Sequence, residues 1–248
     1  MKINSVTSFL PTVVAAAGLV IASSAFSPPA NAYGVTATNA ITLNSGDKGR
    51  TLDPIEWLVP SGSVGTNATL PVNLSAKALV TVDDFTETAL KLTIKITNTT
   101  ISSFQSALVS FGFAVAPDAT SLTTNAPGQV FDNLVLQDGK QNFPGGFKNI
   151  DFCASADNCA GGNINNGLQS GGNSDIVSFT LGGKFSSGVT IASYPAKFQT
   201  SAGSFEVAGV PEPLTVVGSG LALGFGALLK RENSRKRNKA LVKSKLSD

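Results

Sequence analysis

The side chains of this 248-residue chain that could carry chemistry are carboxylates, cysteines and hydroxyls, because the sequence contains no histidine. Without imidazole, Ser-His and Cys-His nucleophile pairs and His-ligated metal sites are excluded. Two groups of carboxylates are conspicuous, and they consist of Asp47, Asp53 and Glu56, just before Trp57, and of Asp83, Asp84 and Glu87.

A glycosidase needs two carboxylates that face each other across a sugar, usually among aromatic side chains. One Trp and two Tyr are few for that task. We therefore interpret these carboxylates as turn and solubility residues and expect no catalytic residue. A secreted carboxylate-based hydrolase stays open as the weaker alternative.

Cys153 and Cys159 are the only cysteines, and five residues separate them. A metal or redox pair is poorly supported, because no third Cys and no His accompanies them. If the chain is exported to an oxidising compartment, we expect a disulfide between them. We expect no metal and no cofactor.

The segment 161–175 is rich in Gly and Asn and is nearly structureless by composition. Its amides and carbonyls could bind a sugar or Ca²⁺, although it lacks the regular acid-bearing repeat of calcium-binding loops. We favour a plain surface loop. A carbohydrate- or Ca²⁺-binding module remains the alternative function.

The elements that must position these groups are expected to be strands. Residues 88–98 alternate between apolar and polar side chains, which is typical of a strand in a sheet that is wet on one face. In residues 104–115 the same alternation places Ala107, Val109, Phe111, Phe113 and Val115 on one face. Further strands are expected at 70–82, 130–136, 176–181, 188–194 and 204–207. Short strands joined by Gly, Asn, Asp, Pro and Ser predict an all-β body, an antiparallel, jelly-roll-like β-sandwich over residues 33–209.

The N-terminal residues 1–32 have the pattern of a secretory signal peptide. Lys2 precedes an apolar stretch over 9–22, and the small residues Ala30 and Ala32 flank Asn31 in a small-x-small cleavage site. This pattern predicts a signal helix that is removed on export.

Residues 214–229 carry no charge and are followed at once by basic residues. Sixteen residues span about 24 Å as a helix, so a short transmembrane helix is expected, with flanking cations at the interface. The basic residues of this cluster are Lys230, Arg231, Arg235, Lys236 and Arg237. The positive-inside rule places this cluster and the tail 240–248 in the cytoplasm and the body outside.

The net charge of +2 conceals a contrast between the tail and the body. Eight of the 18 Lys and Arg residues lie beyond residue 229, whereas residues 33–213 contain 14 acids and 9 bases. An acidic body without a basic stripe cannot neutralise phosphates, so we expect no nucleic-acid partner.

Pro211-Glu212-Pro213 stands between the body and the apolar segment. We expect the segment around it to be extended, solvated and readable by an enzyme, because proline offers no backbone N–H to a helix or a sheet. The order of exported body, Pro-Glu-Pro, apolar helix and basic cluster over 210–239 resembles the PEP-CTERM sorting signal of Gram-negative bacteria.

The resemblance implies that the helix holds the protein in the inner membrane, with the body in the periplasm, until an exosortase recognises Pro211, Glu212 and Pro213 and removes the tail. The protein would then lie at the cell surface or outside the cell, where cargoes of this kind are often linked to exopolysaccharide. The partners implied are the exosortase, the membrane and exopolysaccharide. The sequence therefore predicts a non-enzymatic surface or matrix protein.

Overall fold

The structure, a computed structural model, describes residues 34–35, 39–137 and 143–211. The predicted signal peptide 1–32, the helix 214–229, the basic cluster and the tail 240–248 lie outside these residues. Within the described ranges, no helix is long and apolar enough to cross a membrane.

The described chain is all-β, as predicted, and every pairing between its strands is antiparallel. The first seven strands are β1 (Gly34–Val35), β2 (Ile41–Leu43), β3 (Ile55–Val59), β4 (Leu74–Phe85), β5 (Ala89–Asn98), β6 (Ser106–Ala116) and β7 (Ala119–Ala126). The other seven are β8 (Asn133–Leu136), β9 (Phe152–Ser155), β10 (Leu168–Gln169), β11 (Ser174–Gly183), β12 (Val189–Ala192), β13 (Tyr194–Thr200) and β14 (Gly203–Pro211). Two short 3-10 turns, η1 (Ser45–Asp47) and η2 (Pro144–Gly146), complete the elements.

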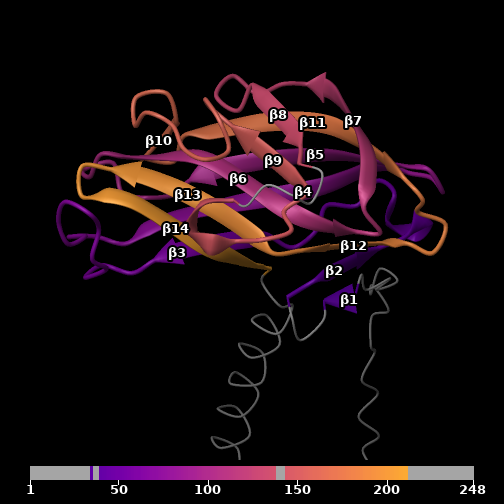
Figure 1. Cartoon of the computed structure of the whole chain (residues 1–248), viewed down its shortest axis with the longest axis horizontal. Helices are drawn as coiled ribbons and strands as arrows, with labels where there is room; N and C mark the ends of the chain where they lie inside the picture. The colour runs from indigo at the N-terminus through magenta and orange to yellow at the C-terminus, as the bar shows by residue number, and fades with distance from the viewer. Residues whose placement is uncertain (1–33, 36–38, 138–142, 212–248) are drawn as a thin grey trace, which may run out of the picture. The chain divides into compact units, whose positions relative to one another are not determined.

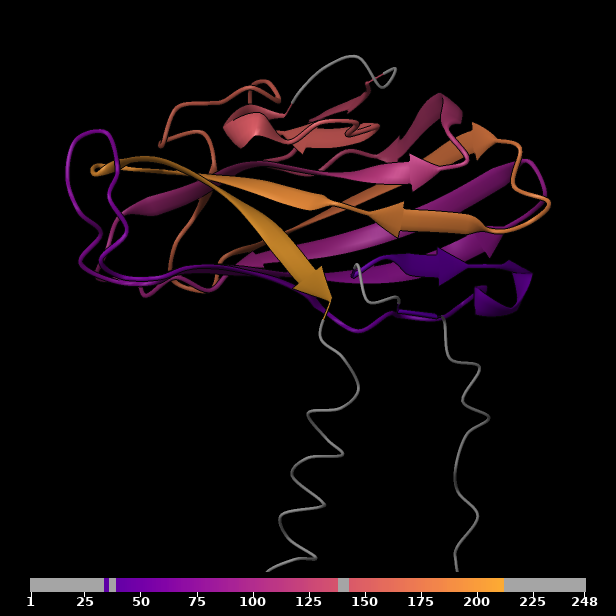
Figure 2. The same cartoon turned by 60° about the horizontal axis from the view of Figure 1, so that its bottom comes forward.

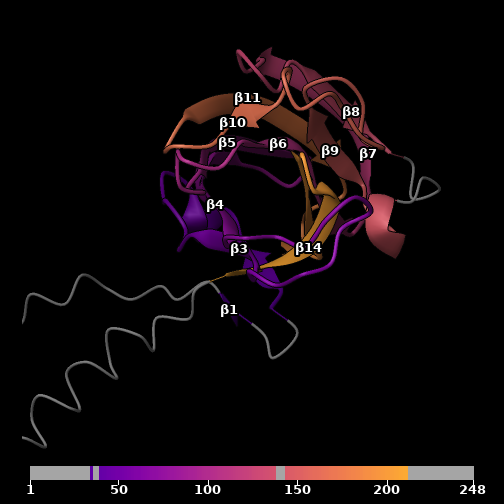
Figure 3. The same cartoon turned by 90° about the vertical axis from the view of Figure 1, so that its left-hand side faces the viewer.

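The strands follow one hydrogen-bonded path, β1-β2-β12-β6-β13-β14-β3-β4-β5-β11-β7. Strands β9 and β10 pair with β6 beside this path, and β8 pairs with β9. The view along the body in Figure 3 shows that the sheet curves round on itself. Its strands contribute apolar side chains to one main core. Because β14 pairs with both β13 and β3, it joins the two parts of the curved sheet. The finer assignment to a jelly-roll-like sandwich stays a prediction.

Strand β5 confirms the alternation read from the sequence. Its apolar residues Leu90, Leu92, Ile94 and Ile96 are all buried, and no residue between them is. The strand lies between β4 and β11 in the sheet, so its polar residues form part of the outer face.

Strand β6 departs from the predicted alternation. Its pairing with β13 shifts by one residue between Leu108 and Ser110, which places a β-bulge at Val109. A bulge reverses which side chains face the core. Leu108 therefore joins Phe111 and Phe113 in the main core, whereas Ala107 and Val109 lie outside it, next to Gly167. The prediction that Ala107 and Val109 share the core face was wrong for this reason.

The sequence did not predict strands β1, β2, β3, β7, β9, β10 and β13. In β7 the residues are mostly exposed, so no apolar alternation marks the strand. Strand β13 contains Pro195, which usually argues against a central strand. Pro195 pairs with Ala208 of β14, but β13 meets β6 only from Ala196 onward, so proline sits outside that second pairing.

A buried carboxylate connects the loop after β7 to the start of β11. Asp175 is 6% exposed, and its two oxygens accept hydrogen bonds from the backbone N–H groups of Gln129, Val130 and Phe131 at 2.8–2.9 Å. A Cβ at Gly128 would collide with the same carboxylate. Glycine at 128 therefore lets the loop close around Asp175.

We predict that Asp175→Ala lowers the free energy of unfolding by about 3 kcal/mol, because three backbone N–H groups lose a charged acceptor. Urea unfolding, followed by circular dichroism, measures the loss. The control is Asp132→Ala, which removes an exposed carboxylate from the same loop region and should change stability by less than about 0.5 kcal/mol. Equal stability of the two variants would contradict a structural role for Asp175.

Candidate functional site

Of the three residues of the predicted sorting motif, the structure describes Pro211. It is the last residue of β14, is buried, and pairs with Ile55 of β3. Figure 2 shows the end of β14, in orange, at the lower side of the body. Glu212 and Pro213 lie outside the described residues, as do Ala30, Ala32 and the basic cluster.

The position of Pro211 differs from the expectation of a solvated segment. Strand β14 extends two residues past the predicted boundary at 209, and of these two residues Val210 is exposed and Pro211 is buried. Proline is tolerated here because it is the last residue of the strand, so its missing N–H removes no hydrogen bond from residues further along the strand. The folded body therefore includes the first residue of the motif.

A compact contact holds this end of β14 in place. Trp57 on β3 is buried, and its Nε1–H donates a 2.8 Å hydrogen bond to the carbonyl of Tyr194 on β13. Tyr194 pairs with Gly209 on β14. A Cβ at Gly209 would lie 2.6 Å from Trp57 Nε1 and 2.7 Å from Ile55 Cγ2, so glycine is needed for the indole to fit.

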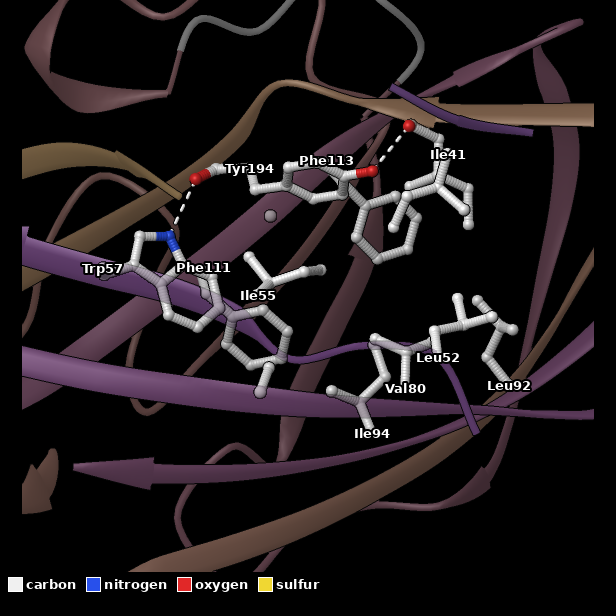
Figure 4. A pocket seen from close by; sticks show the side chains of 13 residues that line it. Ile41, Leu52, Ile55, Trp57, Val80, Leu92, Ile94, Phe111, Phe113 and Tyr194 are labelled. Atoms are coloured by element: carbon white, nitrogen blue, oxygen red, sulfur yellow. Dashed lines mark hydrogen bonds between the residues drawn. The ribbon is translucent and has the colours of Figure 1, made fainter. Parts of the chain in front are cut away.

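Figure 4 shows Trp57 and Tyr194 beside a small internal cavity of about 20 Å³. The Tyr194 hydroxyl donates to the carbonyl of Ile191 at 2.6 Å, and burial raises the pKa of Tyr194 above its ordinary value. The remaining lining comes from apolar groups of β2, β3, β4, β5, β6 and β12 and from the buried Leu52. A void of this size without free polar groups stays dry, so it is a packing gap rather than a ligand site.

The predicted disulfide is present between Cys153 on β9 and Cys159, whose Cα atoms are 6.2 Å apart. Cys153 is fully buried. The bond closes a short loop that includes Asp157, and that loop lies against β6 because the N–H of Ala156 donates to the carbonyl of Val109. The disulfide thus fixes the segment that covers the outer side of β6.

The Gly/Asn-rich segment after the disulfide is more ordered than its composition suggests. Asp157 accepts hydrogen bonds from the N–H of Asn163 and the side-chain amide of Asn166, both at 2.9 Å, and these bonds lower the pKa of its carboxyl. The segment then contributes β10, which pairs with β6. Because the carboxylate of Asp157 is bonded to Asn163 and Asn166, hydrogen bonds within the segment hold it in shape.

The carboxylates singled out in the sequence do not converge on one site. Asp47 accepts from the Arg50 guanidinium at 2.8 Å, Asp84 forms an ion pair with Lys48, and Asp83 accepts from the Thr93 hydroxyl. The Lys48 ammonium lowers the pKa of Asp84. In the described part of the chain, no three His, Cys, Asp or Glu side chains are grouped as metal ligands would be.

A surface cleft of about 370 Å³ lies between the ends of β6 and β12, with Asp118, Asn149 and Asp151 on its polar side. Asp151 is 7% exposed and accepts a 2.6 Å hydrogen bond from the N–H of Val115. Burial raises the pKa of Asp151, and the nearby Asp118 adds to the rise. The lining of this cleft contains no Lys or Arg beside the carboxylates of Asp118 and Asp151.

A second surface cleft, of about 550 Å³, lies among η1, the turn between β4 and β5, and the loop between β11 and β12. A larger share of its lining residues is polar than in the first cleft. The lining consists of Asn44, Ser45, Phe85, Thr86, Glu87, Phe185, Ser186, Ser187 and Gly188. Sequence reasoning grouped Glu87 with Asp83 and Asp84, but in the structure Glu87 lines this cleft and the other two do not.

Comparison with protein-family models, with curated proteins and with solved structures finds no match to this chain.

We predict that Gly209→Ala lowers the free energy of unfolding by about 1–3 kcal/mol, because the added methyl group must displace Trp57 or the end of β14. Trp57 is the only tryptophan, so its fluorescence reports the displacement directly. The control is Gly161→Ala, where a Cβ would make an ordinary 3.4 Å contact with Lys197 Nζ. An unchanged unfolding midpoint and an unchanged emission spectrum in Gly209→Ala would show that the contact is not tight.

Proposed function

We propose that the chain is an exported protein of the cell surface or extracellular matrix, processed by an exosortase at its Pro-Glu-Pro motif. The observation that carries this proposal is the order of Pro211-Glu212-Pro213, the uncharged segment 214–229 and the basic cluster from Lys230. This order matches what a sorting signal needs: a recognition motif, a membrane stop and a cytoplasmic cationic anchor.

The arrangement of the body is consistent with this role. Its last described strand, β14, ends at Pro211, so the motif follows the folded body without a linker between them. The disulfide between Cys153 and Cys159 suits an oxidising compartment outside the cytoplasm. Removal of the tail would therefore leave a folded, cross-linked body.

The body itself is proposed to be structural or associated with exopolysaccharide, and its fold a jelly-roll-like β-sandwich. The support for the sandwich is one core that receives apolar side chains from β3, β4 and β5 and from β2, β6 and β12. The support for a non-enzymatic role is that the described carboxylates mostly hold the fold together. A carbohydrate- or Ca²⁺-binding module is the alternative, and a secreted hydrolase the weaker one.

The sorting proposal predicts that the protein isolated from its native host lacks the residues that follow the motif. Intact-mass measurement with mapping of the C-terminal peptide should place the new end at or near Pro211-Glu212-Pro213. Any mass added there would identify what the mature protein is attached to.

The matched control is Glu212→Ala, which changes only the central residue of the motif and should leave the tail in place. If Leu246-Ser247-Asp248 is found at the C-terminus of the wild-type protein, the chain is a membrane-anchored protein and the sorting proposal is wrong.

The burial of Pro211 predicts that the end of β14 limits access to the motif. Inserting Gly-Ser-Gly between Val210 and Pro211 moves the motif beyond the strand. If releasing the strand end costs about 1 kcal/mol, the insertion should speed removal of the tail about fivefold, as measured by pulse-chase labelling in the host.

The same insertion in the exposed turn between Ser102 and Ser103 serves as control and should leave the rate unchanged. An equal or slower rate for the insertion before Pro211 would show that burial of this residue does not restrain processing. Both variants are compared at equal expression of folded body.

A further inference from the structure

The 550 Å³ cleft among η1, the β4–β5 turn and the β11–β12 loop has the size of a small-molecule site. The loop between β11 and β12 turns at the right-hand end of the body in Figure 1. Three segments that are far apart in the sequence meet at the cleft. Four side chains on the cleft form no hydrogen bond or ion pair within the described chain, and they are Ser45, Glu87, Ser186 and Ser187.

The backbone around the cleft is held by hydrogen bonds, so these side chains are carried by fixed loops. The N–H of Phe185 donates to the carbonyl of Glu87 at 2.7 Å, which ties the β11–β12 loop to the β4–β5 turn. In η1, Asn44 Oδ1 accepts from the N–H of Gly46 at 2.8 Å, and Asp47 Oδ2 accepts from the N–H of Asn44 at 2.9 Å. A site with fixed walls loses little entropy on binding.

Hydroxyls and a carboxylate together favour a ligand rich in hydroxyl groups. The serine hydroxyls can both donate and accept, whereas the Glu87 carboxylate only accepts and can take two adjacent O–H groups. Phe85 also lines the cleft and is 8% exposed, whereas Phe185 is fully buried beneath it, so only a small apolar surface lies beside the polar groups. Polar groups next to a small apolar surface suit the alternating O–H and C–H groups of a sugar.

The charges on the cleft argue against anionic ligands and Ca²⁺. The lining contains no Lys or Arg, so nothing there offsets the charge of a phosphate, a sulfate or an acidic sugar. A single carboxylate supplies at most two of the six to eight oxygen ligands that Ca²⁺ takes. A neutral ligand rich in hydroxyl groups fits the single carboxylate and the serine hydroxyls of the lining.

We propose that this cleft binds a neutral saccharide, with Glu87 accepting hydrogen bonds from two sugar hydroxyls and Ser186 and Ser187 completing the contact. The inference names a binding site for the proposed association with exopolysaccharide. It rests on the proposed function in one respect, because the body meets such a ligand only outside the cell. It does not depend on whether the tail is removed.

The test is isothermal titration of the full-length chain, purified in mild detergent, with neutral tetrasaccharides of glucose, mannose and galactose. We expect at least one of them to bind. Glu87→Gln should weaken that binding about tenfold, because a charge-assisted hydrogen-bond acceptor becomes neutral. Ser186→Trp should abolish it by filling the cleft. Thermal unfolding checks that both variants are folded.

Matched controls remove the same chemical groups elsewhere on the surface. Asp132→Asn neutralises an exposed carboxylate and Ser103→Trp places an indole in an exposed turn, and neither should change the affinity. The proposal is overturned if no neutral tetrasaccharide binds at 10 mM, roughly 100-fold weaker than a moderate 0.1 mM site. Binding that survives both cleft variants, or binding of Ca²⁺ or tetragalacturonate alone, overturns it as well.

The C-terminal mass of the wild-type protein, isolated from the host, separates this inference from the sorting proposal. If the tail is removed but no saccharide binds to the wild type, the cleft inference fails while the sorting proposal stands. If saccharide binds but the tail is retained, the sorting proposal fails while the cleft inference stands.

Discussion

The pairing of β14 with two strands is the constraint on which the rest of the body depends. β14 pairs with β13 along seven residues and with β3 at Val210 and Pro211, and this short second pairing joins the two parts of the sheet. The absence of a side chain at Gly209 lets Trp57 reach the carbonyl of Tyr194. The core is therefore complete only when the last strand of the body is in place.

This dependence connects folding to the proposed processing. Pro211 is both the residue that pairs with Ile55 and the first residue of the Pro-Glu-Pro motif. A processing enzyme that reads the motif must accept it at the end of a folded strand or wait until the strand end opens. The two-residue pairing is short enough for such opening, because the Trp57 contact lies just before it and can stay formed.

The sequence predicts those parts of the fold that depend on local patterns. β5 is found because its apolar residues alternate without interruption, and the disulfide because only two cysteines exist. The sequence does not predict the bulge at Val109, which arises from how β6 meets β13. The same holds for Asp175, whose three backbone donors lie more than 40 residues earlier in the chain, and for the cleft around Glu87, which three distant segments form. Such contacts leave no local periodicity in the sequence.

The carboxylates of the described chain differ in whether they have bonding partners, and this difference distinguishes structural carboxylates from candidate functional ones. Carboxylates bonded to cations or to backbone N–H groups stabilise particular contacts, and in the described chain these include Asp47, Asp84, Asp151, Asp157, Asp175 and Glu206. Their removal would be felt first in stability, because each leaves a partner without its acceptor. Glu87 differs, since its side chain borders a cleft and has no hydrogen-bond or ion-pair partner within the described residues. Asp118 also borders a cleft without such a partner, but a second carboxylate, that of Asp151, lies beside it there. No other charged residue lines the cleft around Glu87, and this contrast favours that cleft as the site for a neutral ligand.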